Sequence, residues 1–191
     1  MDDIRQAIQI DDAAGVRLQL ARGADVNLAD EHGNTLLMLA VREESAASVG
    51  LLLAAGARIN QANAVGDTAL HLAAWNGNPN ILRMLLDQGA SVAANPRGWT
   101  PLMYAAYAGH DGAVKLLLEA ASPVNAATQA GLTALMLAAM KGHEDIVRRL
   151  LAAGADPLQV SADGKTARTL ALENGNTDVA DILAAAEARA R

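Results

Sequence analysis

Histidine side chains could bind a metal ion or transfer protons in this sequence. The chain has four of them, His32, His71, His110 and His143. His110 and His143 are 33 residues apart and each follows a glycine, so they are spaced like elements of a repeat and not like the ligands of one metal ion. We therefore expect structural roles for His71, His110 and His143, an exposed loop position for His32, and no metal site.

Adjacent carboxylates are the second group with possible acid–base chemistry. Asp11–Asp12 and Glu43–Glu44 are such pairs, and we interpret them as solvated residues at turns and helix ends. The chain has no cysteine nucleophile, no Gly-x-Ser-x-Gly motif, no phosphate-binding loop of the Gly-x4-Gly-Lys-Ser/Thr type and no His-Glu-x-x-His motif. We therefore predict no catalytic residue, no cofactor and no enzymatic activity.

The composition limits the other classes of function. Of the 191 residues 52% are hydrophobic and 19% charged, which is enough to bury a core, and the net charge of −6 includes no Lys/Arg cluster that would bind nucleic acid. No apolar stretch reaches the roughly 18 residues of a membrane-spanning helix. The acidic start MDDIRQAIQI lacks the apolar region of a signal peptide. We expect a cytoplasmic protein, or a periplasmic or secreted one if a signal peptide has been trimmed.

A Gly-x-Thr pattern recurs along most of the chain. The five glycines are separated by steps of 33, 32, 33 and 33 residues, and they are Gly33, Gly66, Gly98, Gly131 and Gly164. The first four threonines are followed by LLMLAV, ALHLAA, PLMYAA and ALMLAA, and later in each unit come LLLAAGARIN, RMLLDQGASV, KLLLEAASPV and RRLLAAGADP. The N-terminal segment carries only the second of these two strings, as LQLARGADVN.

Each unit is expected to contain two short helices. The threonine is a good N-cap, and Pro101 falls at a first helical position, where its missing N–H has no consequence. Gly77, Gly109, Gly142 and Gly175 should end the first helix in the left-handed conformation, and Gly56, Gly89 and Gly154 should end the second. Two helices of this length cannot bury their apolar faces alone, so we predict that successive units stack.

The 33-residue period and strings such as GDTALHLAAWNGNPNILRMLLDQGA resemble the ankyrin-repeat family over essentially the whole chain. The resemblance implies an all-α ankyrin solenoid that forms a single domain, residues 1–191. The expected parts are an N-terminal cap (1–29), repeats 1 to 4 (30–62, 63–94, 95–127 and 128–160) and a C-terminal cap (161–191).

Some residues depart from this pattern. Glu44 stands where other units have the helix-ending glycine, so we expect an irregular turn there, and Ser48 occupies a usual core position. Ala121 replaces a glycine at a position that favours positive φ, so its loop takes another path or is strained. Arg168 replaces a core leucine, which suits the polar outer face of a cap.

The resemblance also implies where a partner would bind, because ankyrin-repeat proteins generally bind other proteins with their hairpin tips and first helices. At these positions we expect one row of Trp75, Tyr107 and Met140, with Val65, Trp99 and Leu132 beside it on the tips. Arg97, Lys141, Asp67 and Glu43 would form a charged rim. Tyr104 replaces a core leucine, so we expect it to be buried with its hydroxyl bonded.

The sequence thus predicts a non-enzymatic, monomeric module that binds another protein in a concave groove through an aromatic anchor cluster, as an adaptor, inhibitor or accessory factor. Neither nucleic acid nor a membrane is expected as a partner. The main alternative is a self-associating structural protein whose aromatic row is the homodimer contact. The large side chains could instead pack only along their own repeats, or a small molecule could bind in an apolar cavity below Trp75.

Overall fold

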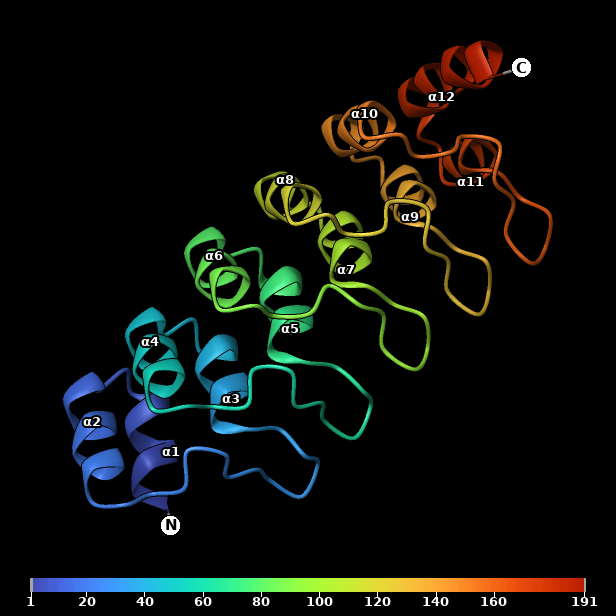
Figure 1. Cartoon of the computed structure of the whole chain (residues 1–191). Coiled ribbons are helices and arrows are strands. Elements are labelled where there is room, and N and C mark those ends of the chain that lie inside the picture. The colour runs from blue at the N-terminus through green and yellow to red at the C-terminus, as the bar shows by residue number, and fades with distance from the viewer. Residues whose placement is uncertain (1, 191) are drawn as a thin grey trace. The chain divides into compact units, whose positions relative to one another are not determined.

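The computed structural model describes residues 2–190. The regular secondary structure of this part is entirely helical, with no strand and one isolated antiparallel bridge between Ala29 and Thr35. The chain divides into two compact units, with the division between Ser91 and Val92. Figure 1 shows that each unit consists of helical hairpins joined by extended loops. The all-α fold predicted from the sequence is confirmed.

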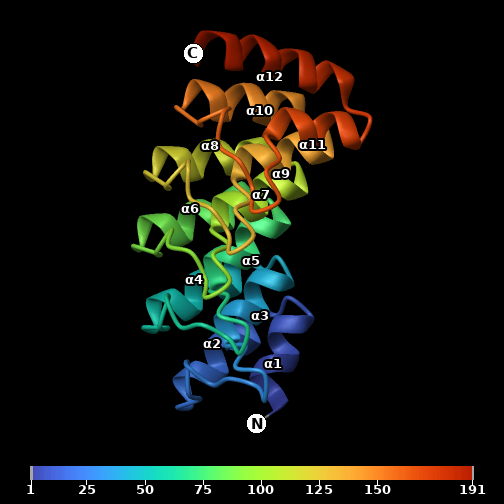
Figure 2. The ribbon, with the colours of Figure 1, turned by 90° about the vertical axis from the view of Figure 1, so that its right-hand side faces the viewer.

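The first unit contains three helical hairpins. In chain order its helices are α1 (Asp2–Gln9), α2 (Ala13–Ala21), α3 (Leu36–Arg42), α4 (Ala46–Ala54), α5 (Ala69–Asn76) and α6 (Pro79–Asp87). The first helix of each hairpin packs on the first helix of the next, α1 on α3 and α3 on α5, and the second helices α2, α4 and α6 pack in the same order (Figure 2).

The second unit repeats this arrangement. Its helices are α7 (Pro101–Ala108), α8 (Asp111–Glu119), α9 (Ala134–Lys141), α10 (Glu144–Ala152), α11 (Ala167–Glu173) and α12 (Thr177–Ala190). Here α9 packs between α7 and α11, and α10 packs between α8 and α12. The bounds of the individual repeats, as opposed to those of the helices, stay a prediction.

Threonine begins the first helix of every Gly-x-Thr unit, as predicted. The hydroxyls of Thr35, Thr100 and Thr133 each accept the backbone N–H three residues on, at 3.2 Å. At Thr68 the backbone N–H donates to Nδ1 of the buried His71 at 3.2 Å. These bonds satisfy N–H groups that a helix start leaves without an intrahelical partner.

Small side chains fill the contact between neighbouring first helices. The two residues that precede the last two positions of α5, α7 and α9 are fully buried alanines, namely Ala73, Ala74, Ala105, Ala106, Ala138 and Ala139. Leucine, isoleucine and valine of the second helices complete the core, for example Ile81 and Leu82 of α6 and Ile146 and Val147 of α10. Alanine allows helix backbones to approach closely, so helices of seven to nine residues can share one packed layer.

Left-handed residues separate the helices. Gly77, Gly109 and Gly142 have φ of 77°, 87° and 75°, as predicted for the ends of first helices. Glu44 has φ of 54° at the equivalent position. This turn therefore has a different residue but the same left-handed conformation as the others, and the prediction of an irregular turn is wrong. Ala121 has φ of 57° where the next repeat has Gly154 at 87°. Of the two outcomes predicted for Ala121, the structure therefore has the strained one.

The N-terminal segment is a complete hairpin, although its sequence indicated only the second half of a unit. Ile4, Ala7 and Ile8 of α1 are buried, and α1 packs on both α2 and α3. Ser48 is fully buried, and its hydroxyl lies 2.8 Å from that of Ser45, which also bonds the carboxylate of Asp11. The hydroxyl at this core position is therefore paired.

A two-fold hydrogen-bonded ion pair links neighbouring second helices in the second unit. Arg149 of α10 donates from Nε and Nη2 to the two carboxylate oxygens of Asp111 in α8, at 2.6 and 2.7 Å. The hydrogen bonds and charge of Arg149 hold the pKa of Asp111 below its usual value, against the opposing effect of burial. The side chain of Asp111 is 41% exposed and that of Arg149 is 35% exposed, so solvent screens part of the interaction.

Ala121→Gly should stabilise the protein. Glycine removes the steric cost of a Cβ in the left-handed region, and the more flexible unfolded chain offsets part of that gain, which leaves an increase of about 0.5–1 kcal/mol in the free energy of unfolding. Urea denaturation measures it. The matched variant Gly154→Ala, where a Cβ would contact nothing within 4 Å, should lose about 1 kcal/mol through φ alone. A destabilised Ala121→Gly variant would contradict strain at this position.

Asp111→Asn should reduce stability more at neutral pH than in acid. Because folding lowers the pKa of Asp111, its stabilisation is fully present above the unfolded-state value of 3.8 and is lost as pH falls below it. After discounting for exposure, we expect a loss of about 0.5–1 kcal/mol at pH 7 and a smaller loss at pH 3. Urea denaturation at both pH values tests this, with Asp181→Asn on the exposed face of α12 as control. An equal loss at both pH values would contradict it.

Candidate functional site

The hairpin loops expose the same positions in each repeat. The two residues before the repeat glycine are exposed in all five Gly-x-Thr loops, and we call them tip positions. The residue after the glycine is covered to a greater extent, since Asn34, Trp99, Leu132 and Lys165 are half-buried. The last two positions of the first-helix segment, seven and eight residues after the threonine, are called helix-end positions. Side chains at the tip and helix-end positions are at least partly accessible, so they are available for contacts with another molecule.

The loop that carries Trp99 is held by the buried side chain of Asn95. The Asn95 side-chain oxygen accepts the N–H groups of Arg97 and Trp99, at 3.0 and 3.1 Å. Asn95 also donates its own N–H to the carbonyl of Trp99 at 2.8 Å. With these three bonds the backbone of Trp99 is fixed relative to the base of the loop.

The following loop supports the Trp99 loop from one side. Gln129 donates its side-chain amide to the carbonyl of Pro96 at 3.1 Å and its backbone N–H to the carbonyl of Arg97 at 3.4 Å. Gly98 has φ of 80°, and a Cβ there would lie 2.8 Å from Cα of Thr128. Glycine is required at this position both by the backbone angle and by the close approach of the two loops.

Three aromatic rings of the second unit form a cluster, which we call the aromatic cluster: Trp99, Tyr104 and Tyr107. The ring centroid of Trp99 lies 5.2 Å from that of Tyr104 and 6.2 Å from that of Tyr107, the latter with an edge-on angle of 77°. All three side chains are half-buried, so part of each remains accessible. Distances and angles of this kind are favourable for aromatic pairs.

The end of α7 places Tyr107 between Trp99 and a lysine. His143 Nε2 donates to the carbonyl of Tyr107 at 3.2 Å, and this bond fixes which ring nitrogen carries the proton. The ammonium of Lys141, at the end of α9, lies 4.5 Å from the centre of the Tyr107 ring, a cation–π contact. Arg97 donates to the hydroxyl of Tyr104 at 3.5 Å, the outer limit of a hydrogen bond. The aromatic cluster is thus flanked by two cations.

The chemistry of this surface changes along the second unit. The position after the glycine and the first helix-end position are Trp99 and Tyr107 in one repeat and the half-buried Leu132 and Met140 in the next. In the last unit they are Lys165 and Glu173, whose charged groups are 2.7 Å apart. This hydrogen bond raises the pKa of Lys165. The apolar surface therefore ends before α11.

The other two predicted site residues lie in the first unit. Trp75, at the end of α5, is 48% exposed, and Val65, at a tip position, is 50% exposed. The predicted row from Trp75 to Tyr107 and Met140 would join the two units and stays a prediction. Within the second unit, the structure brings Arg97, Trp99, Tyr107 and Lys141 together.

Two predictions about single residues are wrong. Tyr104 is half-buried and not part of the inner core; at the same position after the threonine Leu39 and Leu72 are also half-buried, whereas Leu137 is buried. Asp67 is only 7% exposed and cannot belong to a charged rim, although the other residues after a repeat glycine are half-buried. Sequence reasoning thus missed Tyr104 as a member of the aromatic cluster.

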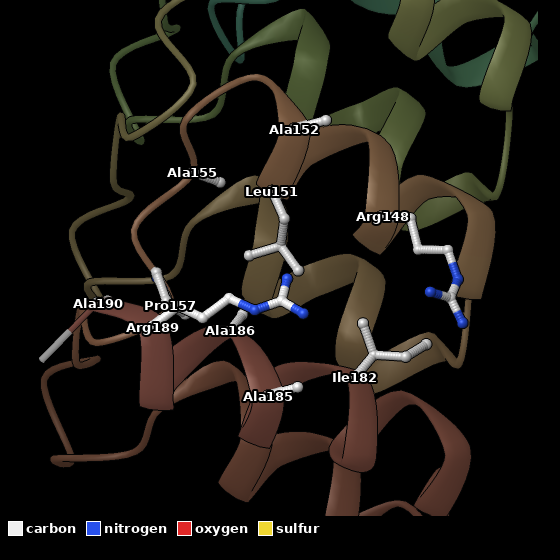
Figure 3. Close-up of a pocket in the computed structure, with 10 residues that line it drawn as sticks. All are labelled: Arg148, Leu151, Ala152, Ala155, Pro157, Ile182, Ala185, Ala186, Arg189 and Ala190. Atoms are coloured by element: carbon white, nitrogen blue, oxygen red, sulfur yellow. The ribbon is translucent and has the colours of Figure 1, made fainter.

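A separate groove lies between α10 and α12. Figure 3 shows its lining, with Leu151 and Arg148 from α10, Ile182 and several alanines from α12, and the guanidinium of Arg189 extending toward Leu151. Its volume is about 550 Å³. Arg148 is already paired with Glu144 at 2.8 Å. None of the predicted site residues lines this groove.

Metal sites and membrane spans are absent from residues 2–190. No cluster of three or more His, Asp or Glu side chains there could hold a metal ion. None of the described helices combines the length and the apolar character that crossing a bilayer requires.

Comparison with known proteins identifies the fold family. A family model described as ankyrin repeats, in three copies, matches residues 4–95, 49–127, 89–161 and 122–191. The chain belongs to the ankyrin-repeat family. Ankyrin repeats generally mediate protein–protein interaction, and the family is typically non-enzymatic.

One curated relative shares part of the sequence. The ankyrin repeat and SAM domain-containing protein 3 of Homo sapiens is 65% identical over 34 residues. This match covers 18% of the ankyrin-repeat chain and 5% of the human protein. It supports the repeat assignment, and it extends over too little of either protein to transfer a specific partner.

Asn95→Ala should loosen the loop of Trp99 in a Trp75→Phe background, where Trp99 is the remaining indole. Two N–H groups lose their acceptor, so we expect a loss of about 1–2 kcal/mol in the free energy of unfolding. Trp99 emission should move to longer wavelength and its anisotropy should fall.

The matched control is Asn63→Ala, because the Asn63 side-chain oxygen accepts the N–H groups of Val65 and Asp67 in an equivalent loop of the first unit. This variant should lose similar stability without altering Trp99 emission. Unchanged emission and anisotropy in Asn95→Ala would show that Asn95 does not position the indole.

Proposed function

We propose that this chain is a non-enzymatic binding module that holds or blocks a partner protein through the surface around the aromatic cluster. Trp99 and Tyr107 are the anchors, Leu132 and Met140 extend the apolar area, and Arg97 and Lys141 form its charged edge. The protein would act as an adaptor, an inhibitor or an accessory factor.

The observation that carries this proposal is the half-exposed aromatic cluster beside exposed loop tips. Tryptophan, tyrosine, methionine and arginine are enriched in the centres of protein interfaces, and a few such residues supply most of the binding free energy. A single exposed apolar residue needs no explanation, whereas several in one place favour a contact surface.

Binding should require little rearrangement of the backbone. The Trp99 loop is bonded to Asn95 at its base and to Gln129 of the next loop, and the end of α7 is bonded to His143. A surface held in this way loses little conformational entropy when a partner binds. Trp75 and Val65 of the first unit are exposed apolar side chains that are also available to a partner.

The triple variant Trp75→Ala/Trp99→Ala/Tyr107→Ala should remain folded and lose its partner. The wild type and the variant are immobilised, and proteins captured from a lysate of the source organism are quantified by mass spectrometry. Proteins specific to the wild type should fall at least about tenfold, because loss of one anchor costs roughly 2 kcal/mol. Leu172→Ala/Val160→Ala, which removes two exposed apolar side chains elsewhere in the second unit, is the matched control and should capture normally.

Three outcomes would contradict the proposal. Recovery of the same proteins by the wild type and the triple variant would show that these residues do not form the binding site. A collapse of the melting temperature in the triple variant would assign the aromatic side chains to self-packing. A wild-type dimer in light scattering at micromolar concentration that Trp99→Ala converts to a monomer would make the surface a homodimer contact.

A further inference from the structure

We propose that the partner segment is acidic: it presents an Asp or Glu side chain to Lys141 and an apolar side chain to the aromatic cluster. This inference rests on the proposed function and names the chemistry of the partner. It is carried by charge complementarity around Tyr107.

The charge at this surface is opposite to that of the chain. The protein has a net charge of −6, yet the tip and helix-end positions of the third and fourth repeats include the cations Arg97 and Lys141 and no Asp or Glu. At the corresponding positions of the next unit, the carboxylates Asp163 and Glu173 are 3.5 and 2.7 Å from Lys165. Those carboxylates therefore already have a cationic partner.

Lys141 is the cation best placed for an incoming carboxylate. It is exposed, and it makes no ion pair with any residue in the described part of the chain. Three other cations of the second unit do have carboxylates: Lys115 has Glu119, Arg148 has Glu144 and Arg149 has Asp111. The Tyr107 ring holds the ammonium of Lys141 from one side at 4.5 Å and leaves its other N–H groups to bind an acceptor.

The geometry limits the spacing of the two partner side chains. The centre of the Tyr107 ring lies 6.2 Å from the centre of the Trp99 ring and 4.5 Å from the Lys141 ammonium. An extended segment advances about 3.3 Å per residue, so its carboxylate and its apolar side chain should lie within about three residues of each other. A partner with this pattern gains an ion pair at the edge of a desolvated aromatic contact.

The test is a selection of random 12-residue peptides displayed on phage against the whole chain. Peptides that bind the wild type and lose binding to Trp99→Ala define the site, and they should be enriched in Asp and Glu near an apolar residue. Synthetic copies are then measured by fluorescence anisotropy. Lys141→Glu should weaken the binding of these peptides about tenfold or more. Raising NaCl from about 50 to about 500 mM should weaken their binding to the wild type.

Lys115→Glu is the matched control, because it makes the same change of charge on the exposed face of α8. It should change affinity less than about twofold. Trp99-dependent peptides without acidic enrichment, or equal effects of Lys141→Glu and Lys115→Glu, would overturn the acidic partner and leave the proposed binding site standing. If no selected peptide depends on Trp99 or on Tyr107, the binding site itself is wrong.

Discussion

Burial of one narrow face on each short helix is the constraint on which both units depend. Helices of seven to nine residues are too short to be stable alone in water. They persist because fully buried alanines, such as Ala73 and Ala106, allow first helices to pack closely, while leucine and isoleucine of the second helices fill the layer behind them. The regular period of about 33 residues agrees with this packing, because each hairpin must align its apolar positions with those of the neighbouring hairpin.

The same constraint determines which residues are available for a partner. Side chains at loop tips and helix ends contribute little to the shared core, so their identity can vary without loss of the fold. In the second unit these places hold an aromatic pair, then an aliphatic and thioether pair, then an ion pair between Lys165 and Glu173. Within this chain, equivalent positions of one repeating backbone therefore differ in chemistry while the backbone conformation is shared.

Most of the fold was predictable because the same local sequence signals recur in each repeat. Threonine caps, left-handed glycines and buried alanines all occur where the period places them. The helix α1 was missed because it lacks a Gly-x-Thr signal and is indicated only by the buried face of Ile4, Ala7 and Ile8. Tyr104 and Asp67 were misplaced because a repeat gives the position of a residue, whereas its exposure depends on the size of the side chain and on the neighbouring loop. The ring contacts of Trp99 could not be read from spacing for the same reason.

Self-packing and partner binding are usually opposed as explanations of exposed aromatic residues, yet in this cluster each favours the other. Contacts of Trp99 with Tyr104 and Tyr107 restrict the rotamers of all three rings before any partner arrives. A restricted side chain loses less conformational entropy on binding, which offsets the apolar area that internal packing has already removed from water. Affinity at such a surface then depends less on further buried area than on a correctly placed polar contact at its edge. The Lys141 ammonium, held against the Tyr107 ring, has the position that such a contact requires.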